Sequence, residues 1–211
     1  MTTVTYGSCI RYTDAMLYSS HALRRSVGMI RNTAHGWGAL ARQAHWLMAA
    51  LILGQVVLGK YAEALDRTPQ KISLLMWHKS LGITLLLLAL LRLGWALANP
   101  RPTLPPDTPP WRRHAVRLSH GMLYGLMLAI PISGWLYNSA RNIPLSLFRL
   151  IPWPPLMEPD EALAPRLGDW HEGLVMALLV LVTLHAGAAL WHHFHQRDSV
   201  LLRMLFDRTR T

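Results

Sequence analysis

Four long apolar stretches dominate the pattern of hydrophobic and polar positions along the chain. They cover about residues 38–60, 74–98, 116–138 and 171–194. Each is close to the ~20 apolar residues that a helix needs to cross a bilayer. Tryptophans, whose amphipathic rings favour the membrane interface, stand at or near the ends of these stretches: Trp37, Trp95, Trp111, Trp135, Trp170 and Trp191. The pattern therefore predicts an all-α fold, an integral membrane four-helix bundle.

Lysine and arginine are divided unevenly between the two sides of this predicted bundle. The N-terminal arm, the second connection and the C-terminal tail hold thirteen basic and four acidic residues, whereas the first and third connections hold seven of each. Cytoplasmic segments carry the excess of positive charge, so both termini are expected in the cytoplasm. The net charge of +10 then reflects membrane orientation and not nucleic-acid binding, because the basic residues are spread between apolar segments.

The segments outside the stretches define the expected domain organisation. Residues 35–205 form one transmembrane domain, preceded by a polar N-terminal extension, 1–34, that is expected to be cytoplasmic and disordered, and followed by a tail, 206–211. The first 28 residues lack the apolar core of a signal peptide. A translation start at Met29 is an alternative hypothesis, because the first apolar stretch follows soon after it.

Two connections have a distinct character. The proline-rich segment 99–111 is predicted to be a stiff, non-helical link, because proline interrupts helices. The longest connection, about 139–170, is expected to cap the outer end of the bundle.

Histidines inside the apolar stretches are the strongest sign of function, since coordinating groups within a membrane are costly. Six lie in or at the stretches: His45, His78, His120, His171, His185 and His192. His171 and His185 are fourteen residues apart, close to four helical turns, so they share one face of the last helix about 21 Å apart. One helix thus offers coordinating groups at two depths.

Partners for these two histidines follow from depth. His45 lies roughly 10 Å from the cytoplasmic end of the first helix, and His185 lies roughly 13 Å from the same end of the fourth. His78, near the outer end of the second helix, is level with His171. The sequence therefore predicts an inner pair and an outer pair of facing histidines.

Two such pairs are what two six-coordinate haems require, because each iron takes one axial imidazole from either face of the porphyrin. We predict that His45 and His185 bind the inner haem iron, and that His78 and His171 bind the outer one. A lone intramembrane histidine is as often a hydrogen-bonding group between helices, but four in depth-matched pairs are hard to explain in that way. The chain has one cysteine, Cys9, and no Cys-x-x-Cys-His motif, so both haems would be non-covalently bound b-type haems.

Other residues are candidates for contacts around the haems. Arg92, in the cytoplasmic half of the second helix, needs an anionic partner and is predicted to bind a propionate of the inner haem; Lys79 is the candidate for the outer one. Small residues near the ligands would leave room for a macrocycle: Gly82, Gly173 and Gly187.

The other histidines have weaker claims. His120 suits a quinone or propionate contact, although a purely interfacial role is favoured. His193 and His195 lie at a cytoplasmic helix end, where basic and aromatic residues commonly anchor the bilayer.

Strings on all four stretches together resemble the bacterial cytochrome b561 family, from about Arg31 to Leu205. They are His45-Trp46-Leu47-Met48-Ala49, Trp77-His78-Lys79-Ser80-Leu81-Gly82, Pro131-Ile132-Ser133-Gly134-Trp135, Trp170-His171-Glu172 and Leu184-His185-Ala186-Gly187-Ala188-Ala189-Leu190-Trp191-His192-His193. The resemblance implies a multi-pass protein of the bacterial inner membrane with the four haem ligands paired as above. It also implies a quinone (ubiquinone) pocket near the inner haem, where Gln43 and His192 occupy fitting positions.

The resemblance further implies a redox enzyme of the superoxide oxidase kind, in which superoxide donates electrons at the outer side and quinone is reduced at the cytoplasmic side. Asp169 stands where the superoxide-oxidising member of the family has a lysine, although Lys79 and Arg166 are basic residues on the same side. Two alternatives stay open. One is an electron carrier or cytochrome anchor subunit that serves a periplasmic redox protein or a larger dehydrogenase; the other is a small transporter whose histidines relay protons.

Overall fold

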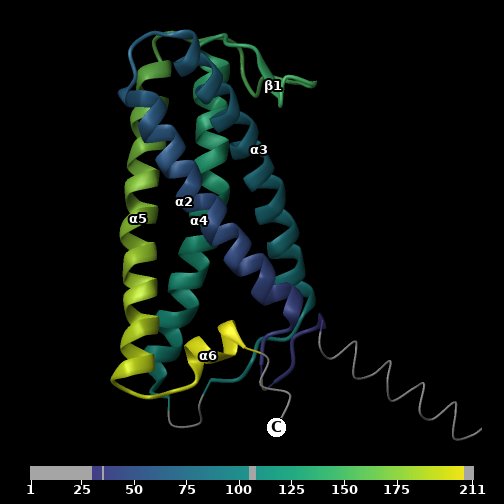
Figure 1. Ribbon diagram of the computed structural model, residues 1–211, viewed down its shortest axis with the longest axis vertical. Coiled ribbons are helices and arrows are strands. Elements are labelled where there is room, and N and C mark those ends of the chain that lie inside the picture. Colours follow the sequence, from purple (N-terminus) through teal and green to yellow (C-terminus); the bar gives the residue numbers. More distant parts are fainter. Residues whose placement is uncertain (1–29, 35, 105–107, 207–211) are drawn as a thin grey trace, which may run out of the picture.

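A computed structural model of the chain describes residues 30–34, 36–104 and 108–206 (Figure 1). The disorder expected for residues 1–34 therefore concerns a segment that lies almost wholly outside the described residues. Four long helices run side by side: α2 (Ala39–Ala64), α3 (Pro69–Ala98), α4 (Pro110–Ala140) and α5 (Ala164–Phe194). The predicted all-α bundle of four membrane-length helices is confirmed.

Three of the helices begin earlier than the apolar pattern predicted, because proline and a capping residue set their first turns. α3, α4 and α5 each have proline at the first or second position, where its fixed φ suits a helix and its missing N–H costs nothing. Thr68 also caps α3, its Oγ1 accepting a hydrogen bond of 3.3 Å from the backbone N–H of Lys71. The non-helical link predicted for 99–111 was too long by two residues, since Pro110 and Trp111 belong to the first turn of α4.

The helices pack in chain order, α2 with α3, α3 with α4 and α4 with α5. α2 and α5, which would close the ring, are not closely packed. Few apolar side chains of the described residues are buried: Met48, Ala62, Ile83, Leu86, Ala89, Ala140, Leu147, Ala164, Leu167 and Leu178.

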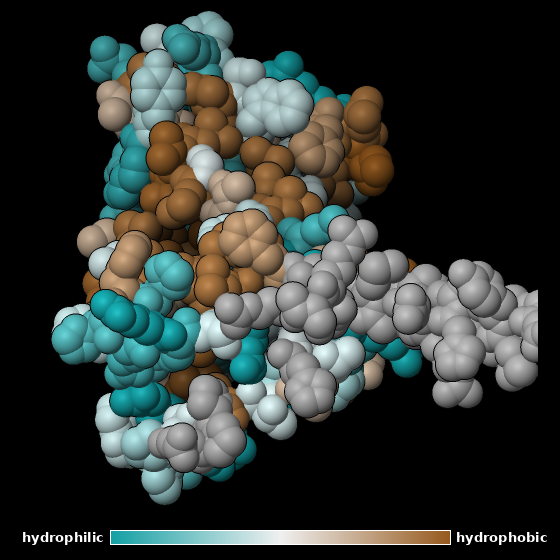
Figure 2. All heavy atoms as spheres, turned by 60° about the horizontal axis from the view of Figure 1, so that its bottom comes forward, coloured by the Kyte–Doolittle hydropathy of each residue, from teal (hydrophilic) through white to brown (hydrophobic). Residues whose placement is uncertain are grey.

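Most apolar side chains point outward. Val57, Leu91 and Leu97 are each about seven-tenths exposed, and Figure 2 shows apolar side chains over much of the face that it presents. Soluble monomers rarely expose contiguous apolar areas beyond a few hundred Å². Since all four helices are also long and apolar enough to cross a bilayer, the exposed apolar surface is the surface that faces lipid.

A β-hairpin between α4 and α5 projects from one end of the bundle, the upper end in Figure 1, which we call the hairpin end. Strand β1 (Leu145–Leu147) pairs antiparallel with β2 (Ile151–Trp153). The Ser80 hydroxyl in α3 accepts a hydrogen bond of 2.9 Å from the backbone N–H of Phe148. Trp135 in α4 donates from Nε1 to the carbonyl of Pro154 at 2.9 Å. No alternating apolar pattern in the sequence predicts this hairpin.

A short helix, α6 (Val200–Leu205), lies across the opposite end, which we call the α6 end. Trp46 Nε1 donates to the Met204 carbonyl at 3.0 Å, and the Arg203 guanidinium donates to the Thr103 carbonyl at 3.1 Å. These two contacts tie the C-terminal segment to α2 and to the link before α4.

Candidate functional site

The four histidines predicted as ligands lie in two facing pairs. The ring centroids of His45 in α2 and His185 in α5 are 6.3 Å apart. Those of His78 in α3 and His171 in α5 are also 6.3 Å apart. These are the pairings expected from depth, with α5 contributing one histidine to each; their role as haem ligands stays a prediction.

The separations suit a shared metal. Two metal–imidazole bonds of about 2.0–2.1 Å, extended on each side by the radius of an imidazole ring, place ring centroids about 6 Å apart. Within the described residues, no group of three or more His, Cys, Asp and Glu side chains is arranged to hold a metal ion. Two imidazoles are too few for a bare metal site, whereas an iron porphyrin supplies its own four equatorial nitrogens. The donor set therefore fits haem.

His171 is oriented by α4. Its Nδ1 lies 3.0 Å from the Ile130 carbonyl oxygen, to which it donates, and 3.1 Å from the Ser133 hydroxyl oxygen. Because Nδ1 donates its proton there, the lone pair of the neutral ring is on Nε2, the nitrogen that is free to bind a metal. A Cβ atom at Gly134 would lie 3.0 Å from the His171 ring. Ser133 and Gly134 belong to a string that the family resemblance had marked, but their contact with His171 was not predicted.

His78 is held by α2. A Cβ atom at Gly59 would come within 2.8 Å of His78 Cε1, so only glycine allows this approach. The Gln55 side-chain amide donates a hydrogen bond to the His78 backbone carbonyl. Nδ1 of His78 is buried and has no hydrogen-bond partner among the described residues. Sequence reasoning missed Gly59 and Gln55, because neither is close to His78 along the chain.

His45 has a different partner. Arg92 Nη2 lies 2.9 Å from His45 Nδ1, and since a guanidinium can only donate, Nδ1 is the acceptor. A neutral His45 then carries its proton on Nε2. This hydrogen bond must be released before Nε2 can bind a metal, which would leave Arg92 available to an anion such as the predicted propionate. Arg92 also lies 5.9 Å from the ring centroid of Tyr124.

A third histidine joins the pair in the α6 half of the bundle. The His120 ring is 5.4 Å from that of His185, edge to face. Its Nδ1 donates to the Val116 carbonyl at 2.8 Å, which leaves Nε2 without a proton in the neutral ring. This contact differs from the purely interfacial role expected for His120 from its position along the chain.

The two residues predicted to border a quinone differ in their surroundings, and their role stays a prediction. Gln43 is exposed, and two residues along a helix it points about 200° away from His45. His192 Nδ1 instead bonds to Asp198 Oδ2 at 2.6 Å, just before α6.

The basic candidates and the glycines are placed as follows. Lys79 is half-buried beside His78, and its charge is close enough to that of Arg141 for the two to repel each other. Arg166 and Asp169 are both exposed near the start of α5. Apart from the adjacent backbone of α5 itself, no heavy atom of the described residues lies within 4 Å of a Cβ atom at Gly173 or Gly187, whereas the Gln55 amide lies 3.5 Å from one at Gly82.

Comparisons with known proteins bear on this arrangement. Residues 36–207 match the family model described as prokaryotic cytochrome b561. "Cytochrome b561 homolog 2" of Escherichia coli (strain K12) is 35% identical over 181 residues, which cover 82% of this chain and 93% of that protein. "Probable superoxide oxidase CybB" of Yersinia pestis is 30% identical over 164 residues, 76% of this chain and 90% of that protein.

The match therefore includes all four long helices, both histidine pairs and α6. By this match, the chain belongs to the prokaryotic cytochrome b561 family of haem b proteins, which transfer electrons in membranes.

Proposed function

We propose that this chain carries electrons across the bacterial inner membrane through two b-type haems, from a periplasmic donor to a quinone at the cytoplasmic side. The observation that carries the proposal is the pair of 6.3 Å histidine contacts, one in each half of the bundle. His78 and His171 would hold one haem at the hairpin end, and His45 and His185 the other at the α6 end. When bound, the haems supply one-electron redox chemistry.

The charge count gives the proposal its direction across the membrane. The described segments at the α6 end carry an excess of basic residues, among them Arg101, Arg112, Arg113, Arg197 and Arg203, so we assign this end to the cytoplasm. The hairpin end is then periplasmic.

A quinone site at the α6 end is supported by the polar groups around His185. His120 contacts the His185 ring, and Arg92 reaches His45 from α3. Arg92 can donate hydrogen bonds to a quinone carbonyl or to a propionate, whereas Nε2 of a neutral His120 can accept one from a quinol hydroxyl. Of the earlier candidates, His192 lies on the face of α5 that carries His185, whereas Gln43 points away from His45.

Superoxide is the periplasmic donor that the resemblance favours. Lys79 beside His78, with Arg141 nearby, gives the hairpin end positive charge close to the predicted ligand, and positive charge steers an anion inward. The Yersinia pestis relative bears the name of such an enzyme. The exposed carboxylate of Asp169 opposes this attraction.

A second candidate is a carrier that exchanges electrons with a periplasmic protein. The turn of the hairpin exposes apolar side chains, with Leu150 81% and Ile151 58% exposed. Such a tip suits contact with a partner protein.

Removal of single ligands tests the haem assignment. His78→Ala and His171→Ala should each remove the hairpin-end haem alone, whereas His45→Ala and His185→Ala should each remove the other. Haem content and reduced-minus-oxidised spectra of the purified variants measure this. If His45→Ala and His171→Ala both lost the same haem, the proposed pairing would be wrong. If the unmodified protein had no b-type absorption bands, the alternative of a proton-relaying transporter would be favoured.

Rapid mixing with superoxide separates the two candidate functions. If the chain is a superoxide-oxidising enzyme, superoxide should reduce its haems at a rate near the diffusion limit. This rate should fall as salt screens the attraction between superoxide and the positive charge at the hairpin end. Slow reduction that does not respond to salt would favour the carrier.

A further inference from the structure

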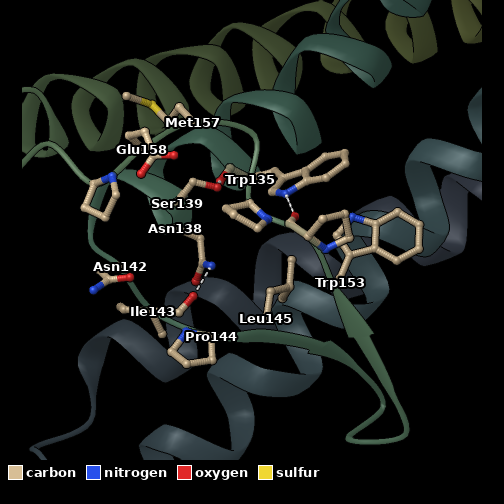
Figure 3. A pocket seen from close by; sticks show the side chains of 13 residues that line it. Trp135, Asn138, Ser139, Asn142, Ile143, Pro144, Leu145, Trp153, Met157 and Glu158 are labelled. Carbon is tan, nitrogen blue, oxygen red and sulfur yellow. Dashed lines mark hydrogen bonds between the residues drawn. The ribbon is translucent and has the colours of Figure 1, made fainter.

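The hairpin between α4 and α5 ends in an exposed apolar tip, formed by Leu150 and Ile151. Its base is fixed to the bundle. Figure 3 shows the indole rings of Trp135 in α4 and Trp153 in β2 side by side, with 5.6 Å between their centroids. From this base the strands extend to the side of the helices, beyond α3 (Figure 1). The tip therefore lies beside the bundle and not above its axis.

The two central residues of the turn hold the tip against α3. Phe148 and Arg149 have positive φ angles of 50° and 61°, a conformation that is unfavourable for residues other than glycine. Both side chains contact α3. The ring of Phe148 lies 5.6 Å from that of Trp77, and Arg149 donates a hydrogen bond of 3.3 Å to the Ser73 hydroxyl. These contacts stabilise the strained turn and fix its position along α3.

The position along α3 sets the depth of the tip in the membrane. α3 has 30 residues, so at 1.5 Å per residue it is about 45 Å long, whereas the hydrocarbon core of a bilayer is about 30 Å thick. About five residues at each end of α3 then lie outside this core, and its boundary falls close to residue 74. Ser73 and Trp77 stand on either side of that level. The tip that contacts them lies where headgroups meet hydrocarbon.

The backbone of the turn suits a place with little water. The N–H of Phe148 is paired with the Ser80 hydroxyl, and the N–H of Leu150 donates to the Leu147 carbonyl at 2.9 Å. Unpaired backbone groups are not tolerated in contact with hydrocarbon, and these two donors are already satisfied within the protein. Apolar side chains at the turn can therefore enter lipid without bringing unpaired N–H groups with them.

We propose that the hairpin tip is anchored in phospholipid, with the side chains of Leu150 and Ile151 in the acyl chains. The tip then continues the lipid-facing surface of α3, on which Ile72 is 64% exposed. Trp77 lies at the interface, where tryptophan is favoured. The bond to Ser73 uses one of the five donors of Arg149, so the guanidinium can also bind a lipid phosphate.

A periplasmic protein is the competing occupant of this tip. To reach apolar side chains at this depth, it would have to displace lipid headgroups. Lipid needs no such displacement, and moving one leucine or isoleucine side chain from water into hydrocarbon favours the inserted arrangement by about tenfold or more. Depth and sideways direction thus favour lipid.

Spin labelling of the purified, haem-loaded full chain in phospholipid nanodiscs tests the proposal. The single cysteine, Cys9, is first replaced by serine, and a nitroxide label is then attached at Leu150→Cys. Glu161→Cys, exposed in the connection that follows the hairpin, is the matched control. Power saturation measures collisions of the label with oxygen, which concentrates in hydrocarbon, and with a nickel chelate, which stays in water. We expect oxygen to dominate at position 150 and nickel at position 161.

A second variant shows whether apolar character at position 150 holds the tip down. With the label at Ile151→Cys, Leu150→Glu should shift the collisions from oxygen toward nickel, because it loses the roughly tenfold preference of one apolar side chain and adds a charge. Leu150→Met should leave them unchanged. Since Leu150 is 81% exposed, none of these changes removes protein packing, and haem absorption should match that of the unmodified protein.

Two results would overturn the proposal. One is equal oxygen-to-nickel ratios at positions 150 and 161, which would place the tip in water, open to a periplasmic protein. The other is an oxygen preference at position 151 that is the same in Leu150→Glu and Leu150→Met. Neither readout depends on electron transfer or on which side of the membrane the hairpin end faces, so failure here leaves the proposed function standing.

Discussion

Gly134 in α4 lies against the imidazole of His171 in α5, so closely that a Cβ atom would be 3.0 Å from Cε1 and 3.2 Å from Nδ1. The same Nδ1 bonds to the Ile130 carbonyl one turn earlier in α4. A side chain at position 134 would therefore push the ring away from the carbonyl that orients it. The glycine allows the approach, and the carbonyl fixes the tautomer.

Gly134→Ala should weaken the hairpin-end haem site without unfolding the bundle. A ring forced about 30° from its rotamer costs of order 0.5–1.5 kcal/mol, which corresponds to roughly a twofold to tenfold loss of haem affinity. Titration of the haem-depleted protein with haem measures it. Gly125→Ala in the same helix is the control, since a Cβ atom there would meet no heavy atom of the described residues within 4 Å beyond the adjacent backbone of α4. Equal affinities for the two variants would contradict the proposed role of Gly134.

Gly59→Ala should have the stronger effect of the two glycine changes. Here the Cβ atom would come to 2.8 Å from His78 Cε1, a distance that real side chains do not tolerate, so the ring or α2 must move. We expect loss of most hairpin-end haem, seen as a drop in the haem-to-protein ratio toward one, with the spectrum of the His45–His185 site retained. Gly54→Ala, in the same helix with open space at Cβ, should keep both haems. A full complement of haem in Gly59→Ala would show that His78 does not need this position.

The long helices and the two histidine pairs were predictable because both follow from properties that are local along the chain. Apolar stretches of membrane length define the helices, and the rise per residue fixes the depth of each histidine once the helix directions are known. The exact helix starts were less predictable, since Pro69 and Pro110 extend helices beyond the apolar positions.

Contacts that depend on how the helices are rotated against one another were not predictable. Gly59 against His78, Arg92 against His45 and His120 against His185 each join residues on different helices. No local periodicity encodes these rotations. The hairpin and α6 were missed for another reason: strands of three residues and a helix of six are too short to produce a periodic signal.

Arg92→Gln should alter the α6-end site and leave the other site unchanged. The variant loses the charge that would neutralise a propionate, so we expect weaker binding of that haem and a more negative reduction potential. Arg92→Lys should recover part of the affinity, because it keeps the charge but loses the planar, two-pronged geometry of the guanidinium. Redox titration of the two haems measures both effects. If Arg92→Gln changed only the reduction potential of the haem held by His78 and His171, the assignment of Arg92 to the other haem would be wrong.

Asp198→Asn should loosen the C-terminal segment. Asp198 Oδ2 bonds to His192 Nδ1 at 2.6 Å, and Oδ1 accepts from the Val200 N–H at 3.0 Å, at the start of α6. The amide keeps one acceptor but loses the charge, and a loss of about 1 kcal/mol, at the upper end for a solvent-accessible pair, is roughly a fivefold change. Hydrogen exchange of residues 199–206 should be faster by about that factor.

Asp160→Asn is the matched control for this change, because Asp160 makes comparable backbone contacts, to Ala162 and Leu163, at the other end of the bundle. The hydrogen exchange of residues 199–206 in Asp160→Asn should be as fast as in the unmodified protein. Because α6 is tied to Trp46 next to His45, a quinone site at this end also predicts an altered quinone reduction rate in Asp198→Asn, with both haems retained. Faster exchange with an unchanged quinone rate would separate the two: α6 would be held by Asp198, and the quinone would bind elsewhere.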